Sequence, residues 1–191
     1  MKIFKSLSTA VLTVFILQVH AQNEIPKGFK NGTVILTDSS VVSGYIKENI
    51  RNHASLVMLD KSGEKKKSYD GSQLISAIID NTKYFCIRGD FFKVISEGEL
   101  NFLQKSSDAS AKPSYNGTET IFNNGTQGKP GDYFIYNKQQ NQLNLVTKKT
   151  IDHVIETSFI NCTEAIDIAK KDRSDLAQLK EAVEVYNNRN K

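Results

Sequence analysis

Short apolar runs that alternate with polar positions dominate residues 30 to 147, and this is the pattern of β-strands. The runs TVILT (33–37) and VVSGYIK (41–47) flank Asp38-Ser39-Ser40 and predict a hairpin. Gly44 inside the second run indicates a bulge or a close approach of a neighbouring backbone. Further strands are predicted at 55–60, 65–69, 74–80, 83–88, 91–95, 99–104, 132–137 and 142–147. We therefore expect a mainly antiparallel sheet over this part of the chain.

Two of these runs also indicate where their strands lie in the sheet. LISAIID (74–80) is apolar at successive positions, which is typical of a strand buried on both faces. KKKSY (65–69) begins with three lysines, which is typical of an exposed edge strand that resists pairing with other chains. A basic binding patch is the alternative interpretation of the lysines.

Residues 105–131 change in character and interrupt the strand pattern. This segment is rich in Ser, Asn, Gly and Pro, and its large apolar residues are Tyr115, Ile121 and Phe122. Such a composition predicts a long polar surface excursion that carries one short strand near 118–122. Tyr115, Phe122, Tyr133 and Tyr136 cluster around it in the sequence. They are a candidate recognition surface, or they pack the excursion onto the sheet.

The apolar period becomes helical after residue 150. The first predicted helix covers 150–159, with Thr150 as its N-cap. Asn161 with Glu164 resembles a capping box before a second helix, and Ser174 is the expected cap of a third. The apolar stripe of the third helix consists of Leu176, Leu179, Val183 and Tyr186. Strands first and helices last predict an α+β fold: an N-terminal antiparallel β-sheet or incomplete small barrel, with two or three C-terminal helices packed on it.

The first 21 residues have the pattern of a secretory signal peptide. Lys2 and Lys5 precede an apolar run from Leu7 to Val19, and small residues end the segment at Ala21. We therefore expect the mature chain to begin at Gln22, to be secreted or periplasmic, and to lack a membrane span after cleavage. Its expected regions are a β-rich part (22–104), the polar excursion (105–131), and a hairpin followed by helices (132–191), all within one domain.

Charge argues against an electrostatic partner. The chain has 25 basic and 21 acidic residues, and removal of the two signal-peptide lysines leaves 23 against 21. A balance this close to neutral does not predict binding to nucleic acid or to anionic lipid. We expect an unknown protein or glycan partner in the envelope or outside the cell instead.

Cys86 and Cys162 are the two cysteines of the chain. In an oxidising compartment a single pair is a disulfide candidate. Two separate free thiols are the equally weighted alternative. The spacing of the two residues matches no zinc-binding pattern, and no cofactor motif is present, so we expect neither a metal nor a cofactor.

Catalytic residue types are few, and their context is weak. His53 and His153 lie far apart in the sequence, and no nucleophile elbow surrounds a Ser or Cys. We therefore expect a protein without catalytic activity. A secreted hydrolase is the alternative, and it would use Cys86, His153 or Asp152. The tripeptide Arg88-Gly89-Asp90 resembles an integrin-binding motif, but Gly-Asp between two strands predicts a turn.

The first hairpin resembles the opening hairpin of Sm-type RNA-binding barrels. The shared framework residues are Val34, Leu36, Asp38, Gly44 and Ile46. Where that family places its base-contacting Asp and Asn, this chain has Arg51 and Ser55. The resemblance therefore implies a twisted hairpin, and we expect no RNA partner.

A second resemblance covers most of the mature chain. The order of features is a signal peptide, the G-x-V-x-L hairpin, a lysine-rich strand, YDGSQLISAI (69–78), a strand bearing Tyr84, and a terminal helix ending in Val185-Tyr186-Asn187. This order is similar to that of uncharacterised exported β-rich proteins of the Bacteroidota. The resemblance implies no known activity. We therefore expect an exported, non-catalytic binding or scaffold protein of the cell envelope or extracellular space.

Overall fold

The computed structural model describes residues 25–109, 113–115, 120–122 and 125–189. Ten strands form one antiparallel sheet: β1 (Lys30–Leu36), β2 (Val41–Asn49), β3 (Ser55–Leu59), β4 (Lys66–Asp70), β5 (Leu74–Ile79), β6 (Thr82–Ile87), β7 (Asp90–Ser96), β8 (Leu100–Lys105), β11 (Tyr133–Asn137) and β12 (Gln142–Val146). A second, two-stranded sheet pairs β9 (Pro113–Tyr115) with β10 (Thr120–Phe122). The helices are α1 (Ile50–His53), α2 (Ile151–Ser158), α3 (Thr163–Lys171) and α4 (Leu176–Asn188). The predicted α+β class with a dominant antiparallel sheet is confirmed.

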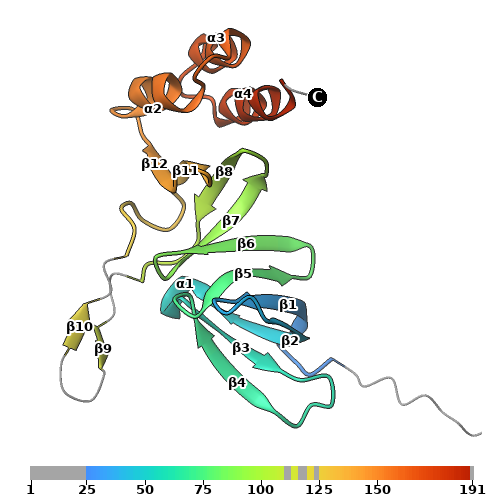
Figure 1. Cartoon of the computed structure of the whole chain (residues 1–191). Coiled ribbons are helices and arrows are strands. Elements are labelled where there is room, and N and C mark those ends of the chain that lie inside the picture. Colours follow the sequence, from blue (N-terminus) through green and yellow to red (C-terminus); the bar gives the residue numbers. More distant parts are fainter. Residues whose placement is uncertain (1–24, 110–112, 116–119, 123–124, 190–191) are drawn as a thin grey trace, which may run out of the picture.

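The strand order is β12-β11-β8-β7-β6-β5-β1-β2-β3-β4 (Figure 1). The sheet is open, with β12 and β4 at its two edges. An isolated antiparallel bridge joins Gly71, which follows β4, to Gly89 in the β6–β7 turn. A Cβ atom at Gly71 would overlap the carbonyl oxygen of Gly89. The bridge therefore requires glycine, and it brings the end of β4 back against the β6–β7 turn.

The turn between β6 and β7 is formed by two residues with a positive φ. Arg88 (φ 52°) and Gly89 (φ 85°) form the two-residue turn between β6 and β7, and Ile87 pairs with Asp90. Positive φ at both positions is the geometry of a type I′ turn. The turn predicted at Gly89-Asp90 is therefore shifted by one residue, and Asp90 is the first residue of β7. Because Asp90 is fully buried, Arg88-Gly89-Asp90 cannot present its carboxylate to a partner.

The N-terminal part of the sheet has its own apolar core. This cluster includes Val34, Ile46, Leu56, Met58, Tyr69, Leu74, Ala77, Ile79 and Phe91. Ile50 of α1 joins it, so the short helical turn between β2 and β3 is anchored by one apolar side chain. Gly44 lies so close to the Leu59 carbonyl group that a Cβ atom would overlap it, which confirms the close backbone approach predicted there.

Two clusters lie in the C-terminal part of the sheet. One joins Leu100 and Phe102 of β8 and Ile135 of β11 with residues of α2, α3 and α4. Figure 1 shows these helices gathered at the β8–β11–β12 end of the sheet. The other cluster consists of Phe92, Leu103 and Phe134, with partly buried neighbours that include Phe85 and Leu145. Alternate residues of β8 and β11 belong to different clusters, so the two clusters lie on opposite faces of the sheet.

The side chain of Asn187, near the end of α4, forms two hydrogen bonds with the backbone of β8, as a neighbouring strand would. Asn187 Oδ1 accepts a hydrogen bond from the Leu100 amide at 2.9 Å, and its Nδ2 donates to the Leu100 carbonyl oxygen at 2.9 Å. Arg189 forms an ion pair with Glu99 at 2.8 Å and lies over the Tyr186 ring at 3.5 Å. These contacts tie the last helical turn to the start of β8.

Several predicted details of the strands are corrected. Ile75 and Ile78 of β5 are each 43% exposed, so this strand is not buried on both faces. The pairing of β5 with β1 shifts between Ile35 and Leu36, which leaves Ile75 as an extra residue. The short helix α1 and the strand β9 were not predicted, whereas β10 overlaps the strand expected near 118–122. β4 is confirmed as an exposed, lysine-bearing edge strand.

Two predicted helix caps are wrong. Asn161 has a φ of 62°, and the N-cap of α3 is Cys162, which makes no side-chain cap bond. The N-cap of α4 is Asp175, whose Oδ1 accepts from the Ala177 amide at 2.8 Å, while Ser174 donates to Asp172. The Asp175 carboxylate, and not the neighbouring Ser174 hydroxyl, therefore accepts from the free amide at the start of α4.

Candidate functional site

Asp90 lies at the start of β7 and is completely buried, and the residues that donate hydrogen bonds to it are also buried. Its Oδ1 accepts from the Ser107 hydroxyl at 3.1 Å and from the Ala109 amide at 2.6 Å. Its Oδ2 accepts from the Thr126 amide at 2.8 Å and from the Thr126 hydroxyl at 2.6 Å. Four donors around one carboxylate satisfy its oxygens where water does not reach them.

Lys105 supplies the counter-charge from the last position of β8. Its Nζ lies 3.1 Å from Asp90 Oδ2, and both side chains have no exposed surface. The same ammonium donates to the carbonyl oxygens of Thr126 at 2.8 Å, Gln127 at 3.4 Å and Gly128 at 3.0 Å. Burial of a charge pair is tolerated when further hydrogen bonds satisfy both ions, as they do here.

The network connects both ends of the polar excursion to one point on the sheet. Ser107 and Ala109 belong to the outgoing end, and Thr126 belongs to the returning end. We call this set of five residues, Asp90, Lys105, Ser107, Ala109 and Thr126, the clasp. Figure 1 shows β9 and β10 standing away from the main sheet beyond it. The clasp therefore holds the root of a separate hairpin.

The returning end of the excursion also lies against the sheet. A Cβ atom at Gly128 would lie 3.1 Å from Phe134 Cζ and 3.2 Å from Leu145 Cδ1, so the backbone there contacts the Phe92–Leu103–Phe134 cluster. Gly128 has a φ of 77°, which favours glycine. The segment 125–131 thus covers part of the face opposite the helices.

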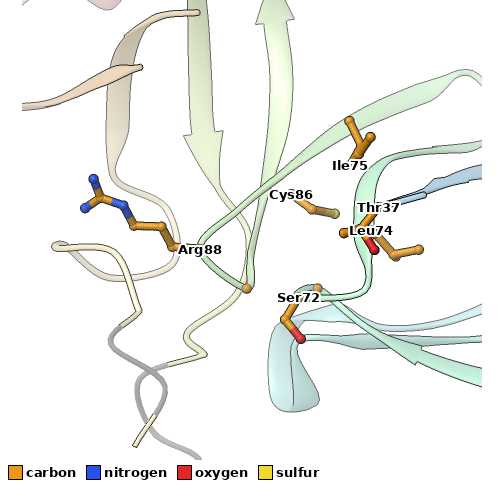
Figure 2. A pocket seen from close by; sticks show the side chains of 8 residues that line it. Thr37, Ser72, Leu74, Ile75, Cys86 and Arg88 are labelled. Carbon is orange, nitrogen blue, oxygen red and sulfur yellow. The ribbon is translucent and has the colours of Figure 1, made fainter. Parts of the chain in front are cut away.

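A hollow of about 530 Å³ lies beside the β6–β7 turn. Figure 2 shows Cys86 directed toward Leu74 and Thr37, whereas the Arg88 side chain extends away from them. The hollow therefore presents a thiol, apolar side chains and hydroxyl groups. Burial, followed by the nearby charge of Asp70, raises the pKa of the Cys86 thiol far above its usual range. The thiol stays protonated at neutral pH and is a poor nucleophile.

The structure does not bring the hydrolase candidates together. Cys86 packs against the N-terminal core, whereas Asp152 and His153 are exposed positions on α2. Asp152 pairs with Arg173 at 2.7 Å, and both side chains are more than half exposed. Because they are consecutive helical residues, Asp152 and His153 point in different directions. His53, at the end of α1, is also exposed.

The two cysteines are free thiols and lie in different parts of the structure. Cys86 borders the N-terminal core, whereas Cys162 is buried among the helices. Of the two alternatives open from the sequence, the structure contains the separate thiols.

The candidate recognition aromatics do not form one described surface. Tyr133 stacks on Phe102 at 5.4 Å on the helix-side face of β11. Tyr136 packs on the opposite face, and its hydroxyl donates to Asn141 at 3.3 Å. Tyr133 and Tyr136 therefore lie on opposite faces of β11. The side chains of Tyr115 and Phe122 lie outside the described part of the structure, as do residues 1–21.

Sequence reasoning missed the clasp, although its signal was present. By local pattern alone, Asp90 is a turn residue and Lys105 is the first polar residue of the excursion. The period of two along a strand places Asp90 on the same side as Phe92, and Lys105 on the same side as Leu103. An acid and a base at facing ends of the β7–β8 hairpin, each aligned with an apolar side chain, predict a buried pair.

No described helix is long and apolar enough to cross a membrane. The described ranges hold no group of three or more His, Cys, Asp or Glu side chains placed to bind a metal ion. No known protein family, no curated protein and no solved structure matches this chain.

Proposed function

We propose that this chain is an exported, non-catalytic binding protein that holds a polar excursion in a fixed position on a β-sheet scaffold. One observation carries the proposal: both ends of the 105–131 excursion bind a single buried carboxylate, Asp90. An unconstrained surface loop needs no such anchor, because its backbone is solvated by water. A loop that must meet a partner in one position gains affinity when it is ordered in advance.

The export part of the proposal rests on the N-terminal sequence pattern that ends at Ala21. Its site of action is then the cell envelope or the extracellular space, and its partner is a protein or glycan found there. The similarity to exported proteins of the Bacteroidota belongs to the same proposal and supplies no activity.

The scaffold part of the proposal is that the C-terminal helices pack on the sheet and stiffen the end from which the excursion leaves. The cluster that α2, α3 and α4 share with β8 and β11 supports this role. The two hydrogen bonds between Asn187 and Leu100 support it as well. β8 connects the two features, because it carries Leu100 at its start and Lys105 at its end.

The non-catalytic part of the proposal is supported by the separation of the candidate catalytic groups. The thiol of Cys86 is protonated and packed against the N-terminal core, away from His153 on α2. Within the described ranges, no hydrogen bond or ion pair joins the side chain of His53 or His153 to an acid or a nucleophile that would make it a general base.

The test is affinity capture with the mature chain, residues 22–191, from envelope fractions and from culture fluid. Wild type is compared with Asp90→Asn/Lys105→Met, which removes both charges of the clasp together. Lys83→Met/Glu97→Gln is the matched control, because it removes an exposed ion pair of 2.6 Å between β6 and the residue that follows β7. Circular dichroism confirms that all three proteins are folded.

We expect wild type and the control to retain the same partner, and the clasp variant to lose it. Capture that is equal for all three folded proteins would contradict the proposal. So would a catalytic turnover that one side-chain substitution abolishes.

A further inference from the structure

A second hollow, of about 320 Å³, lies where α1 meets β6 and the root of the excursion. The polar side chains that line it are Glu48, Asn49, Arg51, Asn52, Tyr84 and Ser106. Its volume falls at the small end of the range of ligand pockets, roughly 300–1,000 Å³. It is thus large enough for one small ring-shaped ligand or for the end of a longer one.

The local sequence explains why so many polar groups meet here. Ile50 is buried in the N-terminal core and anchors the single helical turn of α1. Ala54 adopts a left-handed conformation (φ 41°) and ends the turn at once. Asn49, Arg51 and Asn52 flank the anchor, so the turn directs amide and guanidinium groups to the hollow instead of the core.

The side chains of Asn49, Arg51 and Asn52 have no hydrogen-bond or ion-pair partner among the described residues. Glu48 accepts from Lys30 through Oε1 at 2.8 Å, and no bond to its Oε2 is formed within the same ranges. The hollow therefore offers donors and acceptors that the folded chain itself does not use.

Tyr84 and Ser106, which also line the hollow, are held in place by contacts with other parts of the fold. Tyr84 packs edge-on against buried Phe91, with ring centroids 6.4 Å apart. Its hydroxyl has a raised pKa because of burial and the charge of Glu48, so it remains a donor at neutral pH. Ser106 follows Lys105 of the clasp, and its amide donates to the Phe91 carbonyl oxygen at 2.7 Å. Tyr84 and Ser106 are thus both held in place through Phe91.

The combination of polar groups in the hollow fits one class of ligand better than the alternatives. A phosphate group needs donors and would be repelled by the Glu48 carboxylate. A divalent cation needs oxygen ligands and would be repelled by Arg51, which is permanently charged. A neutral sugar carries hydroxyl groups that both donate and accept, together with an apolar C–H face. Amides, a guanidinium, a carboxylate and a phenol ring match both features.

We infer that the hollow formed by α1, Tyr84 and Ser106 binds a neutral saccharide, as a single residue or as the end of an oligosaccharide. This inference rests on the proposed binding function and gives its ligand class. The glycan is contacted by Asn49 at the end of β2 and by Arg51 and Asn52 of α1, and its ring lies against Tyr84.

The test is a titration of the ¹⁵N-labelled mature chain with glucose, galactose, mannose and N-acetylglucosamine, followed by amide chemical shifts. Inorganic phosphate and calcium chloride are the counter-probes. We expect at least one sugar to shift the amides of residues 49–52, 84 and 106 in a saturable way. Asn52→Ala should weaken that binding about tenfold, since it removes an amide that bonds the ligand. His53→Ala is the matched control on the same turn and should leave it unchanged.

Three results would overturn the inference: no sugar moves these amides, the shifts map elsewhere, or phosphate or calcium alone moves them. The two proposals can fail separately. A failed titration with intact partner capture removes the saccharide site alone. A partner captured equally by the clasp variant, with sugar shifts present, removes the role of the excursion alone.

Discussion

The N-terminal and C-terminal parts of the sheet bury different kinds of groups. Strands β1 to β6 enclose an apolar cluster on one face, and their other face leaves Val41 64% exposed and Ile75 and Ile78 each 43% exposed. Strands β7 to β12 have a buried cluster on each face. Among the described residues, the buried charges are Asp90 and Lys105, both in this second part. A charge pair can be excluded from water where buried clusters lie on both faces of the strands, and we expect the second part to be sensitive to single polar substitutions.

The largest effect is expected at the clasp. Lys105→Ala leaves the Asp90 carboxylate buried without its counter-charge and should lower the free energy of unfolding by about 3–5 kcal/mol. Urea denaturation measures this. Lys129→Ala, an exposed lysine of the same returning segment, is the control and should change stability by less than about 0.5 kcal/mol. A loss below about 1 kcal/mol for Lys105→Ala would show that the pair is not desolvated.

In the N-terminal part the largest effect should come from packing alone. Leu56→Ala empties a fully buried position and should cost about 2–4 kcal/mol. The neighbouring Val57, which is half-buried on the other face of β3, is the matched position for a Val57→Ala control of smaller cost. If Leu56→Ala destabilises the protein more than Lys105→Ala does, the contrast between the two parts fails.

An intermediate effect is expected where α4 meets β8. Asn187→Ala removes two hydrogen bonds to Leu100 and should cost about 1–3 kcal/mol, because the Leu100 amide loses its partner. Asn188→Ala, at the next and exposed position, should be nearly neutral. Equal stability of the two variants in thermal unfolding would show that water replaces the Asn187 amide.

A smaller, pH-dependent effect is expected at Cys86. Burial raises the pKa of its thiol in the folded state above the unfolded value of about 8.5. The associated stability is therefore fully present below that unfolded pKa and declines as the pH rises above it. Cys86→Ala should make stability less dependent on pH between about 8.5 and 10. Mass-spectrometric alkylation at pH 8 should modify Cys86 far more slowly in folded than in urea-unfolded protein, and equal rates would refute the burial of the thiol.

The smallest effect is expected at the exposed pair of Lys83 and Glu97. Their atoms are 2.6 Å apart, closer than those of the clasp pair, yet both side chains are more than a third exposed. Lys83→Ala should therefore cost at most about 1 kcal/mol, and less in high salt. A cost similar to that of Lys105→Ala would show that distance, not burial, decides the strength of these pairs.

Local patterns were sufficient to predict most of the elements. The alternation in TVILT and VVSGYIK predicts β1 and β2, and the stripe on residues 176–186 predicts α4. Period and turn residues act within a few positions of each other, so a single sequence contains them. The capping errors at Asn161 and Ser174 arose because several suitable side chains stand close together and tertiary contacts choose among them.

Features that depend on distant contacts were not predicted. The exposure of Ile75 and Ile78 depends on what covers that face of β5, and the clasp joins Asp90 to Thr126, 36 positions away. α1 forms because Ile50 reaches the N-terminal core while the chain turns between β2 and β3. Four residues carry too short a pattern to predict such a turn, so the hollow that it borders could not be found from the sequence.

The clasp as a single unit is the central claim, and native-state hydrogen exchange tests it most directly. The amides of Ala109 and Thr126 both donate to Asp90, although they belong to opposite ends of the excursion. We predict that they exchange with the same free energy of opening and that Asp90→Asn/Lys105→Met accelerates both together. If either amide exchanges as fast as an unprotected loop, or if only one responds to the double substitution, the excursion is not held as proposed.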